Sequence, residues 1–194
     1  MHDMEELKPL DALISVDRKL IDIMEWHAPD EEPRTYPLEQ HYERYAMLGW
    51  PRDAPVEIVN GFVTAQHLAI YAWFVYAFSS VAELQALVTL EHALRRRMAN
   101  EPARGLKDRL RHAVRAGWIK GERLRTLHPF VNPVSPAAFA SRPVDPHGAE
   151  SLQTFIDNLP EQRNWLAHGN WNGGSDSFMV LDLVLQLINQ LYSR

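Results

Sequence analysis

The chain has 194 residues, of which 46% are hydrophobic, and this is enough to bury one substantial core but short for two ordinary domains. It contains no cysteine, which excludes disulfides, thiolate metal sites and cysteine nucleophiles. Its first residues are acidic and polar, whereas a signal peptide begins with positive charge followed by an apolar run. We therefore expect a cytoplasmic protein.

The formal net charge of −5 hides an uneven distribution along the chain. Residues 92–125 contain eleven Lys and Arg against three acids, a net charge of +8. Such a segment suits a surface that faces phosphate groups. A solvated basic helix face, paired with the acidic amino-terminal third, would have the same composition. Charge alone leaves both interpretations open.

The amino-terminal third combines a helix with an irregular segment. The apolar spacing from Leu7 to Trp26 predicts one amphipathic helix. Residues 28–55 contain five prolines among acids and aromatics, which indicates an irregular, packed excursion with a short helix near residues 39–47. We expect residues 1–61 to form an extension that packs on a helical bundle of residues 62–194, as one folded unit.

The longest helical pattern runs from about Thr64, a suitable N-cap, to about Asn100, with a possible break at residues 79–80. Its apolar run at residues 68–78 has eleven residues, whereas a membrane span needs about twenty. A helix that is apolar on all sides is usually a central core helix. The pattern therefore favours a core helix over a membrane segment.

The remaining pattern is also helical. A helix is predicted at residues 106–118 with a basic exposed face, followed by a proline-rich loop at residues 129–146. Helix resumes near residue 149, and Asn158 with Pro160 predicts a helix start or restart that ends at Gly169. The last helix, at residues 178–192, presents one stripe of large residues: Leu181, Leu185, Ile188 and Tyr192. No strand pattern appears, so the predicted class is an all-α helical bundle.

The sequence gives little support for a metal site or a serine nucleophile. No two of the nine histidines are three or four residues apart, and none lies in a cluster of carboxylates. Serine-nucleophile motifs are also missing. We expect neither a metal site nor a cofactor.

The segment RNWLAH at residues 163–168 concentrates a cation, an amide and an imidazole. Asn164 and His168 share a helix face, whereas Arg163 and His168 are about 140° apart around the helix and can converge only near its end. A guanidinium can hold a phosphate, an imidazole can move protons near neutral pH, and an amide can orient either group. These side chains suit metal-free cleavage of a ribose phosphate backbone.

This segment resembles the Arg-polar-x-x-x-His signature of the HEPN superfamily, helical-bundle proteins of prokaryotic toxin–antitoxin, abortive-infection and other defence systems. The surrounding sequence is similar as well. A long helix rich in Ala, Leu and Glu, at residues 81–98, comes first, and a shorter helix then ends in a Gly-Trp-Ile turn at residues 117–119. The resemblance covers roughly residues 62–192.

The resemblance implies an endoribonuclease in which two protomers place their motifs face to face. Arg163 would hold the scissile phosphate, His168 would act as general acid or base, and Asn164 would position them. The products would carry 2′,3′-cyclic phosphate and 5′-hydroxyl ends. RNA would be attracted by the basic segment, through six arginines in particular: Arg95, Arg96, Arg97, Arg109, Arg111 and Arg115. An antitoxin or other regulatory protein is a further expected partner.

A second hypothesis remains open, because many HEPN-like domains are thought to be non-catalytic binding modules. Arg163, Asn164 and His168 can simply cap a helix end at Gly169 and tie it to its neighbour. In that case His168 would be buried and hydrogen-bonded, and the basic segment would be paired within the chain. Nucleotide or small-molecule binding is a more distant third. Under any hypothesis, we expect Trp165, Leu166 and Trp171 to pack in the core or at a dimer contact rather than to stack on bases.

Overall fold

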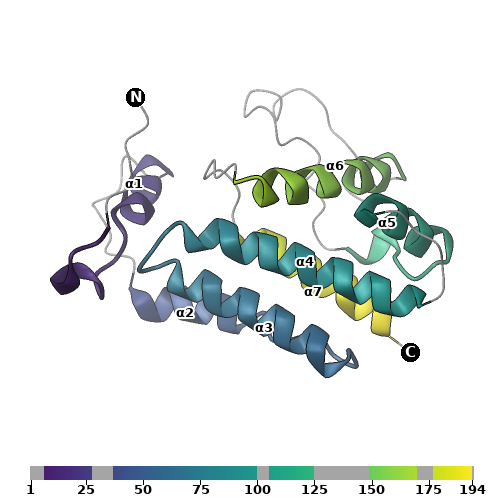
Figure 1. Ribbon diagram of the computed structural model, residues 1–194, viewed down its shortest axis with the longest axis horizontal. Coiled ribbons are helices and arrows are strands. Elements are labelled where there is room, and N and C mark those ends of the chain that lie inside the picture. The colour runs from purple at the N-terminus through teal and green to yellow at the C-terminus, as the bar shows by residue number, and fades with distance from the viewer. Residues whose placement is uncertain (1–6, 28–36, 100–104, 125–148, 170–176, 194) are drawn as a thin grey trace.

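A computed structural model describes residues 7–27, 37–99, 105–124, 149–169 and 177–193 of the chain. Every regular element in these ranges is a helix (Figure 1), which confirms the predicted all-α class. The elements are η1 (Leu10–Ala12), α1 (Arg18–His27), α2 (Leu38–Ala46), α3 (Val56–Tyr71), α4 (Phe78–Met98), α5 (Gly105–Arg115), η2 (Gly121–Arg123), α6 (Ala149–Ala167) and α7 (Ser177–Tyr192).

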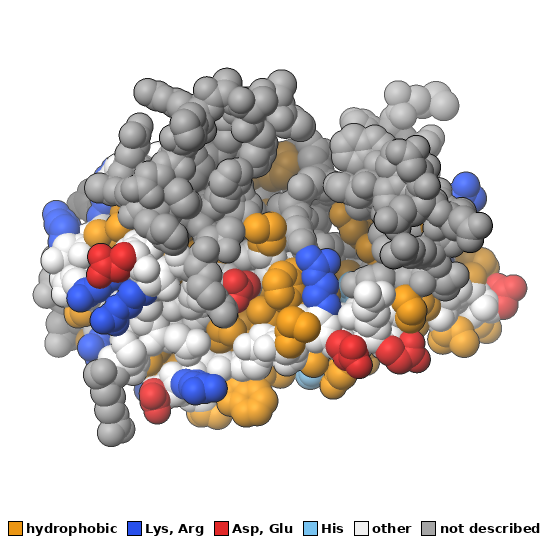
Figure 2. Space-filling model, turned by 180° about the vertical axis from the view of Figure 1, so that it is seen from behind, with side chains coloured by type: hydrophobic (Ala, Val, Ile, Leu, Met, Phe, Trp, Pro, Cys, Tyr) orange, Lys and Arg blue, Asp and Glu red, His pale blue; other side chains and the backbone are white. Residues whose placement is uncertain are grey.

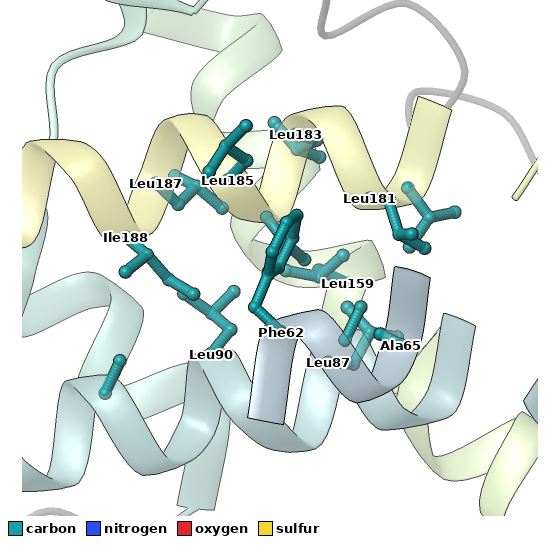
Figure 3. Close-up of a cluster of buried hydrophobic side chains, with 14 of the residues drawn as sticks. Phe62, Ala65, Leu87, Leu90, Leu159, Leu181, Leu183, Leu185, Leu187 and Ile188 are labelled. Carbon is teal, nitrogen blue, oxygen red and sulfur yellow. The ribbon is translucent and has the colours of Figure 1, made fainter. Parts of the chain in front are cut away.

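Helix α4 is the centre of the bundle. It packs against α3 and α7 along its length, and α5 and α6 contact it from another side (Figure 1). Figure 3 shows the seam between these helices, where Phe62 of α3 lies among Leu87 and Leu90 of α4 and the leucines of α7. Burying each such side chain contributes about 1.5–3 kcal/mol relative to exposure. This seam is the main source of stability among the described helices.

The predicted stripe of the last helix is confirmed. Leu181, Leu185 and Ile188 are buried, and Tyr192 is partly buried at the end of the same face. The Tyr192 hydroxyl donates a hydrogen bond to the Ala93 carbonyl at 3.2 Å. Helix α7 is thereby fixed to α4 by a polar contact as well as by its apolar face.

The prediction of a helix start at Thr64 is wrong. Helix α3 begins at Val56, directly after Pro55, so residues on either side of position 61 lie in one continuous helix. Proline fits this place because the first helical residues have no intrahelical acceptor for their N–H groups. Thr64 lies inside the helix, where its hydroxyl donates to the Asn60 carbonyl at 2.8 Å.

The predicted break at residues 79–80 is also misplaced, because the chain turns at residues 72–77. Backbone groups freed by this turn are bound by the extension: Tyr76 N–H donates to Asp17 Oδ2 at 2.9 Å, and Lys8 Nζ donates to the Phe74 carbonyl at 2.8 Å. The apolar run at residues 68–78 therefore ends α3 and forms the turn, and it is not a central core helix. No helix within the described ranges is long and apolar enough to cross a membrane.

The single helix predicted from Leu7 to Trp26 is two elements, η1 and α1. Asp17 separates them and caps α1, since its Oδ1 accepts a hydrogen bond from the backbone N–H of Lys19 at 2.9 Å. Within the extension, residues 7–27 contact the α3–α4 turn through Asp17, and Figure 1 places α1 at the end of the bundle opposite α5. Helix α1 thus does not cover the basic helix α5.

Helix α6 runs without a restart from residue 149 through Pro160, so the predicted helix start at Asn158 is wrong. Its predicted end is confirmed: Gly169 has φ +77°, a left-handed conformation that favours glycine, and its N–H donates to the Leu166 carbonyl at 3.0 Å. The proline-rich loop predicted at residues 129–146 lies outside the described residues.

Helices α3 and α4 lie close together at Gly61. A Cβ atom added there would lie 2.7 Å from Thr89 Oγ1 and 3.1 Å from its Cγ2. We expect Gly61→Ala to lower the free energy of unfolding by up to about 2 kcal/mol, because overpacking of about 1–3 kcal/mol exceeds the helix-propensity gain of about 1 kcal/mol. Denaturant midpoints of the variant and the wild type measure the difference.

Thr89→Ala removes both close atoms and is the matched background for this test. In that background Gly61→Ala should stabilise the protein, because only the propensity gain remains. The same loss of stability in both backgrounds would contradict the assignment of Thr89 as the clashing side chain.

His41 on α2 is buried, and its Nε2 lies 2.9 Å from the Ala69 carbonyl oxygen. Burial, and more weakly the charge of Arg44, lowers the pKa of His41 below its ordinary value of 6.5. Between the two values the unfolded chain binds a proton that the folded protein does not bind. The contribution of the neutral His41 ring to the free energy of unfolding is thus fully present above pH 6.5, and it decreases as the pH falls below that value. We expect the melting temperature of His41→Gln to depend less on pH between 7 and 5 than that of the wild type.

His67→Gln is the matched control, because His67 is exposed on the neighbouring helix α3. It should keep the pH dependence of the wild type. A His41→Gln protein whose melting temperature falls with acid as steeply as the control's would show that His41 does not contribute.

Candidate functional site

Arg163 lies on the side of α6 that faces α4, and its side chain is 32% exposed. Its Nη2 is 3.4 Å from Glu91 Oε2, and its Nη1 donates to Asn164 Oδ1 at 3.3 Å. The third nitrogen, Nε, is buried and has no hydrogen-bond partner among the described residues. The guanidinium is therefore held on one edge and unsatisfied at Nε.

Glu91 on α4 connects two of the predicted site residues. Its side chain is only 15% exposed, and its second oxygen, Oε1, lies 3.5 Å from Arg95 Nη2. One carboxylate thus lies between the guanidinium groups of Arg95 and Arg163. Sequence reasoning did not select Glu91, although a signal existed: it is an acid on a helix face that also carries the buried Leu87 and Leu94.

His168 and Asn164 lie at the exposed carboxyl end of α6. The backbone N–H of His168 donates to the Asn164 carbonyl at 3.0 Å, but its imidazole makes no hydrogen bond to any placed residue. No hydrogen bond or ion pair joins His168 to Arg163. The structure therefore unites Arg163 with Asn164 and leaves the imidazole facing solvent.

The neighbouring aromatic residues differ in burial. Leu166 belongs to the core, whereas Trp165 is 41% exposed on the surface that carries Asn164 and His168. Trp171 lies outside the described residues. The core role is confirmed for Leu166, and Trp165 remains a candidate dimer contact.

A pocket of about 360 Å³ opens beside Arg163, between α4, the first turn of α5 and the second half of α6. Charged groups from all three helices line it: Glu91, Lys107, Asp157, Glu161 and Arg163. The pocket combines cations that can bind a phosphate with acids that hold those cations in place. Lys107, Asp157 and Glu161 were not among the predicted site residues, because their proximity depends on how α5 and α6 pack.

Asp157 repeats the arrangement seen at Glu91. Lys107 Nζ lies 2.9 Å and Arg111 Nη2 3.1 Å from Asp157 Oδ1, and Gln153 Nε2 donates to Oδ2 at 3.0 Å. The hydrogen bond from Gln153, followed by that from Lys107, holds the pKa of Asp157 below its ordinary value. This carboxylate stays charged and fixes two cations beside the pocket.

The other predicted RNA-binding arginines are engaged in different contacts. Arg96 pairs with Glu57 on α3, whereas the guanidinium of Arg97 lies over the Trp118 ring, 5.2 Å from its centroid. Of the arginines on α5, Arg109 is partly buried and engaged in a contact, and Arg115 is exposed. Figure 2 shows a face on which basic, acidic and hydrophobic side chains alternate. Arg95 and Arg111 pair with Glu91 and Asp157, two carboxylates that line the pocket.

Among the placed residues, no three His, Asp or Glu side chains gather as metal ligands would. Comparison of the chain with protein-family models, with curated proteins and with solved structures gives no match to any of them. The chemistry of this site therefore has to be inferred from its own residues.

Proposed function

We propose that this protein is a metal-independent endoribonuclease of the HEPN type that acts as a homodimer. The observation that carries the proposal is the surface at the end of α6. It exposes the imidazole of His168 and the amide of Asn164, next to a pocket in which Arg163 and Lys107 supply positive charge. Exposure of His168 is what a proton-transfer role requires and what a purely structural role does not.

The reaction uses the RNA's own nucleophile. The 2′-oxygen attacks the adjacent phosphorus as it loses its proton, and the bond to the 5′-oxygen of the next nucleotide breaks as that oxygen gains a proton. His168 accepts or donates one of these protons, and Arg163 stabilises the charge that develops on the phosphate. Asn164 orients Arg163 through the 3.3 Å contact. The products carry 2′,3′-cyclic phosphate and 5′-hydroxyl ends.

A dimer completes the site. Arg163 and His168 are about 140° apart around α6, and in one protomer the guanidinium faces α4 while the imidazole faces solvent. A second copy that apposes the ends of the two α6 helices brings two imidazoles to one phosphate, so that one can accept a proton and the other can donate one. Trp165, exposed on this surface, is the residue that such a contact would cover.

The second candidate is a non-catalytic binding module, and ion pairing within the chain favours it. Arg96 is paired with Glu57, and Lys107 and Arg111 with Asp157, so part of the basic segment is already neutralised. For both candidates we propose a cytoplasmic protein with RNA and an antitoxin-like regulator as its partners. The biological context of a HEPN-type protein would be a role as a toxin or in defence.

Cleavage of a mixed cellular RNA pool in EDTA tests the proposal. We expect the wild type to cleave, and His168→Ala to lose about 10²–10⁴-fold in rate, the usual contribution of general acid–base catalysis. Arg163→Ala should lose about 10²–10³-fold as charge stabilisation is removed. The melting temperature of His168→Ala should equal that of the wild type, because the imidazole is exposed.

His67→Ala is the control for this assay, since it removes an exposed histidine of α3 away from the pocket. It should cleave like the wild type. Equal inactivity of the wild type and both site variants, with RNA still bound, would favour the binding module instead.

Dimerisation is tested through Trp165. We expect Trp165→Ala to raise the dimer dissociation constant at least about tenfold, because truncation of a central interface tryptophan costs about 2 kcal/mol or more. Sedimentation measures the association, and specific activity should fall in parallel on dilution. Trp50→Ala is the matched control, as Trp50 is also exposed but lies between α2 and α3. A Trp165→Ala protein that dimerises as tightly as this control would exclude the surface as the interface.

A further inference from the structure

Glu91 occupies the place of a counter-ion in the candidate site. Its two oxygens lie 3.4 Å from Arg163 Nη2 and 3.5 Å from Arg95 Nη2. The side chain is largely buried between α4 and α6, and it also lines the pocket. A carboxylate in this position is the counter-ion of the group that the proposed reaction uses to hold phosphate.

The contact between Arg163 and Glu91 uses only part of what the guanidinium can offer. Guanidinium groups bind carboxylates and phosphates through two parallel N–H donors, commonly at 2.7–2.9 Å. Here Nη2 alone reaches Glu91, at 3.4 Å, while the adjacent Nε is buried and lacks a partner among the described residues. A buried donor without an acceptor is unfavourable, so an oxyanion with two oxygens would satisfy this edge better than Glu91 does.

Carboxylate and phosphate bind guanidinium with the same planar geometry, and they therefore compete for it. We propose that Glu91 and an RNA backbone phosphate are alternative partners of Arg163. In the free protein Glu91 holds the guanidinium at Nη2. A phosphate that enters the pocket displaces the carboxylate from Nη2 and then also accepts from the adjacent Nε. This inference rests on the phosphate-binding role of Arg163 in the proposed function.

The surroundings make the exchange feasible. Arg95 stays beside Glu91 after Arg163 leaves, so the largely buried carboxylate keeps one counter-ion. Lys107 lines the same pocket and adds positive charge for the incoming phosphate. Glu91 is thus an internal competitor that weakens the binding of isolated anions and favours a polyanion with several phosphates.

Binding measurements on Glu91→Gln test the inference. The substitution keeps the size of the side chain and removes its charge. The probes are inorganic phosphate and a 2′-O-methyl RNA oligonucleotide, which lacks the nucleophile and cannot be cleaved. We expect Glu91→Gln to bind both probes at least about fivefold more tightly than the wild type. In an Arg163→Ala background the same substitution should have no such effect.

Glu57→Gln is the matched control, because Glu57 also pairs with an arginine of α4, Arg96, but lies on α3 away from the pocket. It changes the net charge equally and should tighten binding by much less. Glu91→Gln affinities that equal those of this control, or that fall as in Arg163→Ala, would overturn the inference. Tighter binding of inorganic phosphate alone would assign the pocket to free phosphate rather than RNA and would overturn it too.

Failure of the proposed function has a different signature. If Arg163→Ala binds both probes as the wild type does, the phosphate-binding role of Arg163 itself is wrong. If Arg163→Ala weakens binding and Glu91→Gln does not strengthen it, only the competition is wrong. The two results are separable because neither probe requires cleavage.

Discussion

The burial of α4 fixes the positions of the helices and side chains that pack around it. Its apolar residues face α3 and α7, so the helix cannot rotate without exposing the leucine seam of Figure 3. Glu91 is thereby fixed at the edge that faces α6, where a largely desolvated carboxylate requires a cationic partner. Arg163 supplies that cation from α6. The core thus determines the position of the guanidinium that the site uses.

The charges around the pocket explain how a segment of net charge +8 fits a protein of net charge −5. Two carboxylates, Glu91 and Asp157, each hold two cations, and both line the pocket. Under the proposed function, phosphate binding would exchange these existing ion pairs instead of filling a bare basic surface. The affinity gained for each phosphate would then be smaller than a count of arginines suggests, and it would depend on which acids can release their partners.

The sequence predicts the helical class, the core stripe of α7 and the end of α6 at Gly169. These features depend on the spacing of apolar residues and on a glycine that ends a helix, and both are local properties of the sequence. The boundaries of α3 and α4 could not be predicted in this way. The turn at residues 72–77 is stabilised by Asp17 and Lys8, which are more than fifty residues away in sequence. The same limit applies to the site: the motif at Arg163 is visible in the sequence, but its contact with Glu91 spans 72 positions and exists only after α4 and α6 pack.

In the proposed mechanism, the end of α6 gives a site that a second protomer would complete. Arg163 faces inward to a carboxylate, whereas His168, on the last turn before Gly169, faces outward with Asn164 and Trp165. Trp165 is partly exposed beside this polar motif, and tryptophan is enriched at protein interfaces. A second copy covering Trp165 would exclude water from the imidazoles and strengthen their interaction with a bound phosphate. The surface that would drive dimerisation is thus the same surface from which the proposed reaction requires water to be excluded.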